Sequence, residues 1–190
     1  NILKAMSDYV FTSRYARYSE DVKRRLTWAE VNSIVKEMHL KKYPQIEQEI
    51  RWAFDYSEKK KVLGSQRGLQ FGGEPVIKHN ARLYNCSASY CDRPRFFQEA
   101  MYLLLCGCGV GFSVQKHHIA KLPKIQSRTE KTKTFVIPDN IEGWSDAIGV
   151  LLSSFFVENQ EFPDYFGFKV NFDYSEIRPE GSNLSSGVGK

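Results

Sequence analysis

The sequence has 190 residues, of which 42% are hydrophobic, 14% aromatic and 26% charged, and its formal net charge is +5. This composition is typical of one packed domain with or without a small appendage, and it argues against a disordered chain. The apolar runs 101–105 and 150–157 are too short to cross a bilayer, and the mild, scattered basic excess suits an anionic small ligand better than duplex nucleic acid.

The cysteines indicate the cellular compartment of the protein, and the two chain ends indicate that it is part of a longer protein. The four cysteines come without a signal-peptide core in residues 1–9, which favours a reducing compartment, so we expect a cytoplasmic protein. The chain begins at Asn1 without an initiator Met and ends in the turn-rich stretch 185–190. Both ends are therefore expected to be cuts inside a larger protein.

The first third of the chain predicts helices. Residues 1–20 indicate a short helix and a connector. The run from Thr27 to Glu30 has the pattern of a capping box, which opens a helix that ends before Pro44. A second helix is expected over residues 46–60. No group of residues typical of a catalytic or metal site occurs in this region. The single His39 is expected to be a surface or packing residue.

A glycine-rich stretch separates this region from the rest. Residues 64–73 contain four glycines and predict a loop, and they lack the Lys-Ser/Thr ending of a P-loop. We take this loop as a boundary and expect a helical region over residues 1–72 and a β-containing region over residues 73–190.

The second region alternates strand and helix patterns, which predicts an α/β fold with a mostly parallel sheet. Strands are expected over residues 81–89, 110–114, 134–137 and 168–174. The first helix between them is expected to start at Asp92 and Pro94, and another spans residues 140–158. Residues 115–134 read as a basic loop, and a turn is expected at 177–181.

The four cysteines lie between residues 86 and 108, spaced C-x4-C-x14-C-x-C. A zinc site prefers closely paired cysteines on turns, so zinc is disfavoured, and no metal ligand is expected in this chain. A cysteine nucleophile needs a base, for which His79, His117 and His118 qualify only by residue type. Packing is the preferred role for three of the four, which are Cys91, Cys106 and Cys108.

Cys86 stands in a recognisable context. The run L-Y-N-C-S, then D-R-P-R-F-F-Q-E-A-M-Y-L-L-L-C-G-C-G-V-G-F-S-V and K-L-P, resembles ribonucleotide reductases. Further similar runs are G-S-Q-R-G-L-Q-F-G-G, I-E-G-W-S-D-A and D-Y-S-E-I-R-P-E-G, so the resemblance spans nearly the whole chain in order. It is strongest to the monomeric, adenosylcobalamin-dependent (class II) ribonucleoside-triphosphate reductases.

The resemblance implies a fold and an activity. These enzymes have an N-terminal helical region followed by a ten-stranded α/β barrel, of which this chain would supply the first strands. They reduce the ribose 2′-OH with a thiyl radical and a redox-active cysteine pair. The radical cysteine, its partner residues and the second redox cysteine match nothing in this chain. Either a longer chain or a second chain must therefore complete the barrel, and these 190 residues alone are not expected to be active.

The resemblance also implies roles for residues. Cys86 matches the first member of the redox pair. Asn85, Gly109, Gly111 and Glu74 are implied neighbours of the substrate.

Asp92 lies where the family places polar residues that contact the effector, and residues 115–134 lie where its effector loops occur. The implied cofactor is adenosylcobalamin. The implied partners are a ribonucleotide substrate, a deoxynucleotide effector and a thioredoxin-type reductant, with no nucleic acid and no membrane.

Three other readings remain open from the sequence. The chain could belong to a metal-dependent (class I) ribonucleoside-diphosphate reductase with a separate radical-generating subunit. It could be a non-catalytic nucleotide-binding or scaffolding fragment with structural cysteines. A zinc-binding nucleic-acid module is the weakest alternative.

Overall fold

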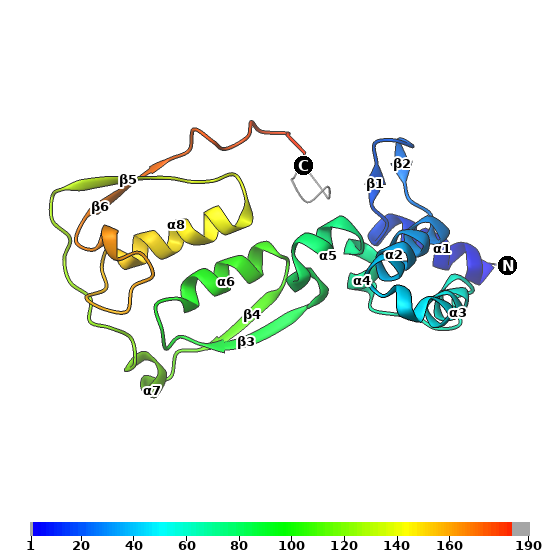
Figure 1. Cartoon of the computed structure of the whole chain (residues 1–190), viewed down its shortest axis with the longest axis horizontal. Coiled ribbons are helices and arrows are strands. Elements are labelled where there is room, and N and C mark those ends of the chain that lie inside the picture. Colours follow the sequence, from blue (N-terminus) through cyan, green and yellow to red (C-terminus); the bar gives the residue numbers. More distant parts are fainter. Residues whose placement is uncertain (1, 184–190) are drawn as a thin grey trace. The chain divides into compact units, whose positions relative to one another are not determined.

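The computed structural model describes residues 2–183 (Figure 1). By its internal contacts the chain divides into two compact units, one made of the described residues up to Leu83 together with Asn183, and the other running from Tyr84 to Ser182. The first unit is mainly helical and the second alternates strands and helices, as expected for an α/β chain. The division into residues 1–72 and 73–190 remains an expectation for the domains of the whole protein.

The first unit holds five α-helices, two short 3-10 turns and one small antiparallel hairpin among its described residues. They are α1 (Ile2–Arg14), β1 (Tyr18–Ser19), β2 (Arg24–Arg25), α2 (Trp28–Lys42), η1 (Pro44–Ile46), α3 (Glu47–Glu58), α4 (Gln66–Phe71), α5 (Glu74–Lys78) and η2 (Asn80–Leu83).

The predicted capping box starts α2. Thr27 Oγ1 accepts the Glu30 N–H, and Glu30 Oε2 accepts the Thr27 N–H at 2.7 Å, so two N–H groups at the helix start are satisfied. The buried side of α2 then packs into a core that includes Phe11, Val31 and Leu69. Local sequence and core packing thus agree on where this helix begins.

The glycine-rich stretch 64–73 is not the loop that the sequence predicted, because it contains helix α4. Ser65 caps this helix by accepting the Gly68 N–H, and Leu69 is buried in the core. Only Gly73 takes a left-handed backbone, with φ at 91°. Burial of Leu69 therefore outweighs the poor helix propensity of Gly68, the one glycine within α4.

The second unit consists of two βαβ segments. The first is β3 (Cys86–Tyr90), α6 (Phe96–Leu105) and β4 (Gly109–Ser113), and the second is β5 (Thr132–Val136), α8 (Ile141–Ser153) and β6 (Lys169–Asp173). Each strand pair is parallel, and α7 (Lys116–Ile119) and η3 (Pro163–Tyr165) lie in the connections. Within the described residues the two pairs form separate two-stranded sheets, so the ten-stranded barrel is not observed and stays a proposal.

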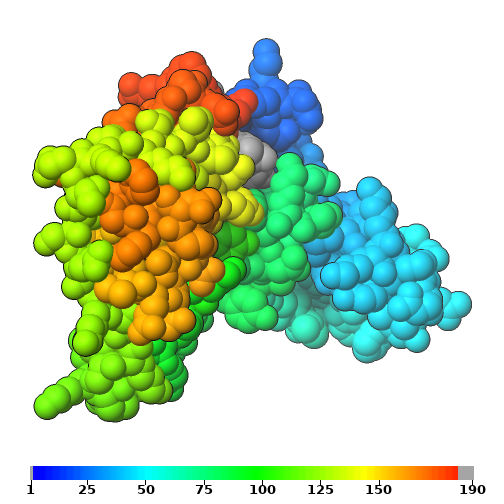
Figure 2. All heavy atoms as spheres, turned by 60° about the vertical axis from the view of Figure 1, so that its left-hand side comes forward, coloured from blue at the N-terminus to red at the C-terminus, as the bar shows by residue number. Residues whose placement is uncertain are grey.

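Helices α6 and α8 pack against each other between the two strand pairs (Figure 1). Gln98 on α6 donates its Nε2–H to Asp146 Oδ1 on α8 at 3.0 Å. Gly149 makes room for Gln98, since a Cβ at that position would lie 2.3 Å from Gln98 Cδ. Figure 2 shows the surface over β5 (yellow-green) and β6 (orange), which lie side by side.

Several predicted boundaries in the second unit are wrong. The strand expected over residues 81–89 begins at Cys86, because residues 80–83 form η2. The helix expected to start at Asp92 and Pro94 begins at Phe96, after a turn. The helix over residues 140–158 ends at Ser153, and the loop 115–134 contains the short helix α7.

No helix among residues 2–183 combines the length and the apolarity that crossing a membrane requires. The predicted turn at the chain end, residues 185–190, lies outside the described residues.

Candidate functional site

The register of β3 and β4 determines which residues lie beside Cys86. The two strands are parallel, with Cys86 opposite Gly109 and Ala88 opposite Gly111. Side chains alternate along a strand, and directly paired residues point to the same side of the sheet. Cys86 and the two glycines on the neighbouring strand therefore share one face of the strand pair, and their contact with a substrate stays a prediction.

Helix α6 covers the opposite face of this strand pair. The ring of Phe112 on β4 lies 5.0 Å from the ring of Phe96, the buried first residue of α6. Cys86, Ala88 and Tyr90 alternate onto the other side and are exposed. We call this side, with Gly109 and Gly111, the open face. It presents a reactive residue type on a rigid strand.

Neither glycine of the open face is required by its local structure. Both have an ordinary negative or extended φ, and a Cβ would meet only Asn85 O at 3.5 Å from Gly109 and Ser87 O at 3.7 Å from Gly111. These are ordinary contact distances. Glycine in a strand interior is unfavourable and often marks a close approach to the backbone, so the bare surface beside Cys86 suits a bound ligand. By contrast, Gly107 has φ at 85° and is needed to end α6.

Asn85 lies just before β3, outside the strand in which it was expected. Its backbone carbonyl accepts the Gly109 N–H at 2.8 Å, which fixes the register of the two strands. Its side chain is exposed next to Cys86 in the sequence. Glu74 lies in the first unit, exposed in the first turn of α5, and its part in substrate binding stays a prediction.

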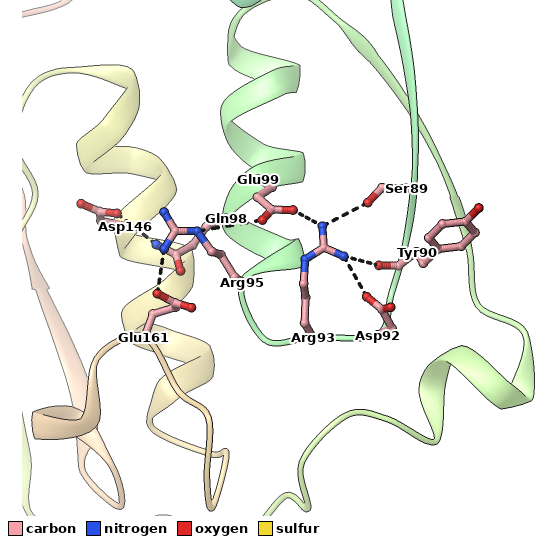
Figure 3. A network of polar contacts seen from close by, with 9 residues as sticks. All are labelled: Ser89, Tyr90, Asp92, Arg93, Arg95, Gln98, Glu99, Asp146 and Glu161. Carbon is pink, nitrogen blue, oxygen red and sulfur yellow. Dashed lines mark hydrogen bonds and ion pairs between the residues drawn. The ribbon is translucent and has the colours of Figure 1, made fainter.

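Asp92 belongs to a network of polar contacts at the carboxyl end of β3 (Figure 3). Its carboxylate pairs with the Arg93 guanidinium at 2.8 Å. Arg93 also pairs with Glu99 and donates to Ser89 Oγ and Tyr90 O, and the Glu99 and Asp92 carboxylates raise the pKa of Arg93. An effector at Asp92 would thus have to share this carboxylate with Arg93.

The same network reaches the second βαβ segment. Arg95, in the turn before α6, donates to Glu161 Oε2 at 3.0 Å, and Gln98 bonds to Asp146 on α8 (Figure 3). The residues at the carboxyl end of β3 are therefore linked to α6 through Glu99. Helix α6 is in turn linked to α8 through Gln98. The sequence did not reveal this network, because it joins residues far apart in the chain, such as the bonded pair Arg95 and Glu161, which are 66 residues apart.

His118 joins the carboxyl end of the open face, which the sequence indicated only by residue type. Its Nδ1 lies 2.9 Å from Ser113 Oγ on β4, and its ring packs 4.5 Å from the Tyr90 ring on β3. Burial, and then the nearby His117 and Lys121, lower the pKa of His118.

Tyr90 is four residues beyond Cys86, about 13 Å along the strand at roughly 3.3 Å per residue. His118, at that end, is too distant to act as a base for Cys86.

The other three cysteines are packing residues, as expected. Cys91, Cys106 and Cys108 are 5%, 0% and 2% exposed. Burial, together with the charge of Asp92, raises the pKa of the Cys91 thiol, which keeps it protonated and unreactive. Cys86 is the one exposed cysteine of the four, and all are free thiols.

Comparison with known proteins supports the resemblance seen in the motifs. No family model matches the chain. It is 31% identical over 134 residues to the adenosylcobalamin-dependent ribonucleoside-triphosphate reductase of Euglena gracilis, which covers 66% of this chain and 17% of that protein. It is also similar to the crystal structure of a B12-dependent (class II) ribonucleotide reductase, with a TM-score of 0.73 and 19% identity over 94% of this chain and 33% of the other.

The chain thus spans about a sixth of the curated relative's length, and its fold is that of part of a class II ribonucleotide reductase. The resemblance that the motifs predicted is confirmed in sequence and in fold.

Proposed function

We propose that this chain forms the N-terminal part of an adenosylcobalamin-dependent ribonucleotide reductase. The observation that carries the proposal is the open face: an exposed Cys86 in register with the bare backbone of Gly109 and Gly111. The similarity to class II reductases supplies the reaction. In it, the ribose C2′–O bond breaks, a C2′–H bond forms, and the hydroxyl leaves as water.

Cys86 would supply one of the two thiols that are oxidised in this reaction. The two-electron reduction of the ribose is balanced by joining Cys86 and a second cysteine, outside this chain, in a disulfide. An external thioredoxin-type dithiol then restores both thiols by thiol–disulfide exchange. A strand suits this role, since it holds the sulfur at a fixed position beside the ribose.

The neighbours of Cys86 would bind and orient the nucleotide. The bare backbone of Gly109 and Gly111 lets the ribose approach the sheet closely. We assign Asn85 and Glu74 to contacts with the ribose and phosphates, and Asp92 to a deoxynucleotide effector. The rest of the ten-stranded barrel, with the radical cysteine, would come from a longer chain or from a second chain.

The cofactor is inferred from the relative's name. When bound, adenosylcobalamin would supply the radical that starts the reaction. Residues 2–183 contain no group of three or more His, Cys, Asp or Glu side chains that could hold a metal ion. We assign no residue of this chain to the cofactor. A metal-dependent class I reductase is the alternative. Activity of the complete enzyme that needs no added cobalamin would favour it.

The test is Cys86→Ser in the complete enzyme, assayed for deoxynucleotide formed per enzyme molecule with a dithiol reductant. We expect the variant to fold but to lose multiple turnover, since serine cannot form the disulfide. The control is Cys91→Ala, which removes a buried thiol and should keep multiple turnover. Sustained turnover by Cys86→Ser would contradict the proposal and favour a non-catalytic role for this chain.

A further inference from the structure

The first unit contains a pocket that the proposed reductase chemistry does not use. It has a volume of about 380 Å³ and lies between α2, α3 and α4. Val35 and Leu69, 5% and 4% exposed, belong to the hydrophobic core and line it, whereas Val62, which is 60% exposed, also lines it. The pocket therefore connects the surface to the core, with a size in the usual range for a small-molecule site.

The walls of this pocket select a neutral ligand. None of its lining residues is Asp, Glu, Lys or Arg, and a charge bound there would lose water without gaining an ionic partner. Phe54 and Met38 both line it, and the Met38 sulfur is held in place by accepting the Gly73 N–H at 3.2 Å. A phenyl ring and a thioether both pack well against a flat aromatic ring.

Two of the three polar side chains in the wall, His39 and Ser57, offer hydrogen-bond acceptors. His39 Nδ1 lies 2.8 Å from Val35 O, and because a carbonyl can only accept, Nδ1 carries the hydrogen and Nε2 is left as an acceptor. Ser57 already donates its hydroxyl hydrogen to Asn32 Oδ1 at 2.5 Å, which leaves its oxygen lone pairs. Ser65, also in the wall, accepts the Gly68 N–H and keeps its hydroxyl hydrogen. A ligand that brings an N–H can therefore bond to His39, while Ser65 can still donate to an acceptor on the ligand.

We propose that this pocket binds a neutral, flat heteroaromatic ring that donates an N–H to His39. The His39 ring is itself fixed, tilted against Phe54 with the ring centroids 5.7 Å apart. This site is separate from the open face and does not depend on the reductase assignment.

Indole and benzofuran, titrated into the 190-residue chain and followed by NMR, test the proposal. The two have the same shape, but only indole carries an N–H. Indole should bind with a dissociation constant of about 1 mM or lower. Benzofuran should bind roughly fivefold more weakly, the usual effect of one hydrogen bond. His39→Phe should abolish this difference.

A variant whose new side chain fills the pocket tests whether indole binds there. Ala53 is an exposed residue of α3 that lines the pocket, so Ala53→Phe should occupy it and abolish indole binding without unfolding the chain. Gln48→Phe adds the same ring to an exposed position of α3 outside the pocket and should leave binding unchanged. Indole binding that survives Ala53→Phe, or equal binding of the two ligands to the unmodified chain, overturns the proposal.

Discussion

Gly111 lies on the open face, two residues along β4 from the glycine paired with Cys86. We predict that Gly111→Ala raises the KM for the ribonucleotide by about tenfold, because the new methyl group stands where the ribose approaches the backbone. The substitution should not destabilise the strand, since the nearest atom to the added Cβ is Ser87 O at 3.7 Å. Alanine should instead stabilise it by about 0.5–1 kcal/mol. Steady-state kinetics of the complete enzyme and thermal unfolding measure the two effects.

The matched control is Gly64→Ala in the first unit, where a Cβ has no atom within 4 Å and φ is not positive. It should leave the KM unchanged. If Gly111→Ala leaves the KM unchanged while the fold is retained, the open face does not bind the ribose.

Single residues differ in how far the sequence could predict them. Cys86 could be singled out because the runs on both sides of it resemble a known family. The ion pairs of Arg93 could not, because Asp92 and Glu99 meet it only through the turn that delays the start of α6 to Phe96. Asp92 was expected to open the helix, but its carboxylate is held by Arg93 instead.

The first turn of helix α2 makes a pH-dependent contribution to the stability of the folded chain. Hydrogen bonds from Arg24, and then from the Thr27 backbone and hydroxyl, lower the pKa of Glu30 to about 2. A carboxylate whose pKa is lower in the folded chain stabilises it above the ordinary value of 4.5, and this stabilisation is lost as the pH falls towards 2. We therefore predict that stability declines between pH 4.5 and 2, in part through this group.

Glu30→Gln isolates that contribution, because glutamine keeps the hydrogen bond of the capping box and cannot ionise. Urea unfolding of the chain between pH 2 and 6 should show a smaller decline for the variant. Glu37→Gln, at an exposed position of the same helix, should retain the decline of the original chain. Identical pH profiles for Glu30→Gln and the original chain would mean that the ion pair with Arg24 contributes nothing to stability.

At the scale of elements, those with local signals were predictable and those set by pairing were not. The capping box fixed the start of α2, and Asn140, whose side chain accepts the Gly143 N–H at 2.6 Å, fixed that of α8. The strand expected from residue 81 has the right composition, but it has nothing to pair with before Cys86. The chain opposite is still completing the turn at Gly107 that ends α6. A strand therefore forms only where a neighbouring strand is present to pair with its backbone.

The strands of the second unit bury fewer residues than the long helices of either unit. None of the residues of β3, β4, β5 or β6 is fully buried, whereas α2 buries Val31, Asn32 and Val35. Parallel sheets are normally covered on both faces and rarely consist of two strands. The sequence could predict the βαβ segments, whereas the proposed barrel would need strands that the described residues do not supply.

This difference in burial predicts which elements of the 190-residue chain unfold locally most often. Local opening costs least where few apolar side chains are buried, so amides of β5 should exchange with solvent at least about tenfold faster than those of α2. Hydrogen exchange followed by NMR measures both in one sample. If the chain is part of the proposed reductase, adding the rest of that enzyme as a second polypeptide should slow exchange in β3 and β4 and leave α2 unchanged, because only the strands gain partners. Equal protection of strands and helix in the chain alone would show that these strand pairs need no further strands.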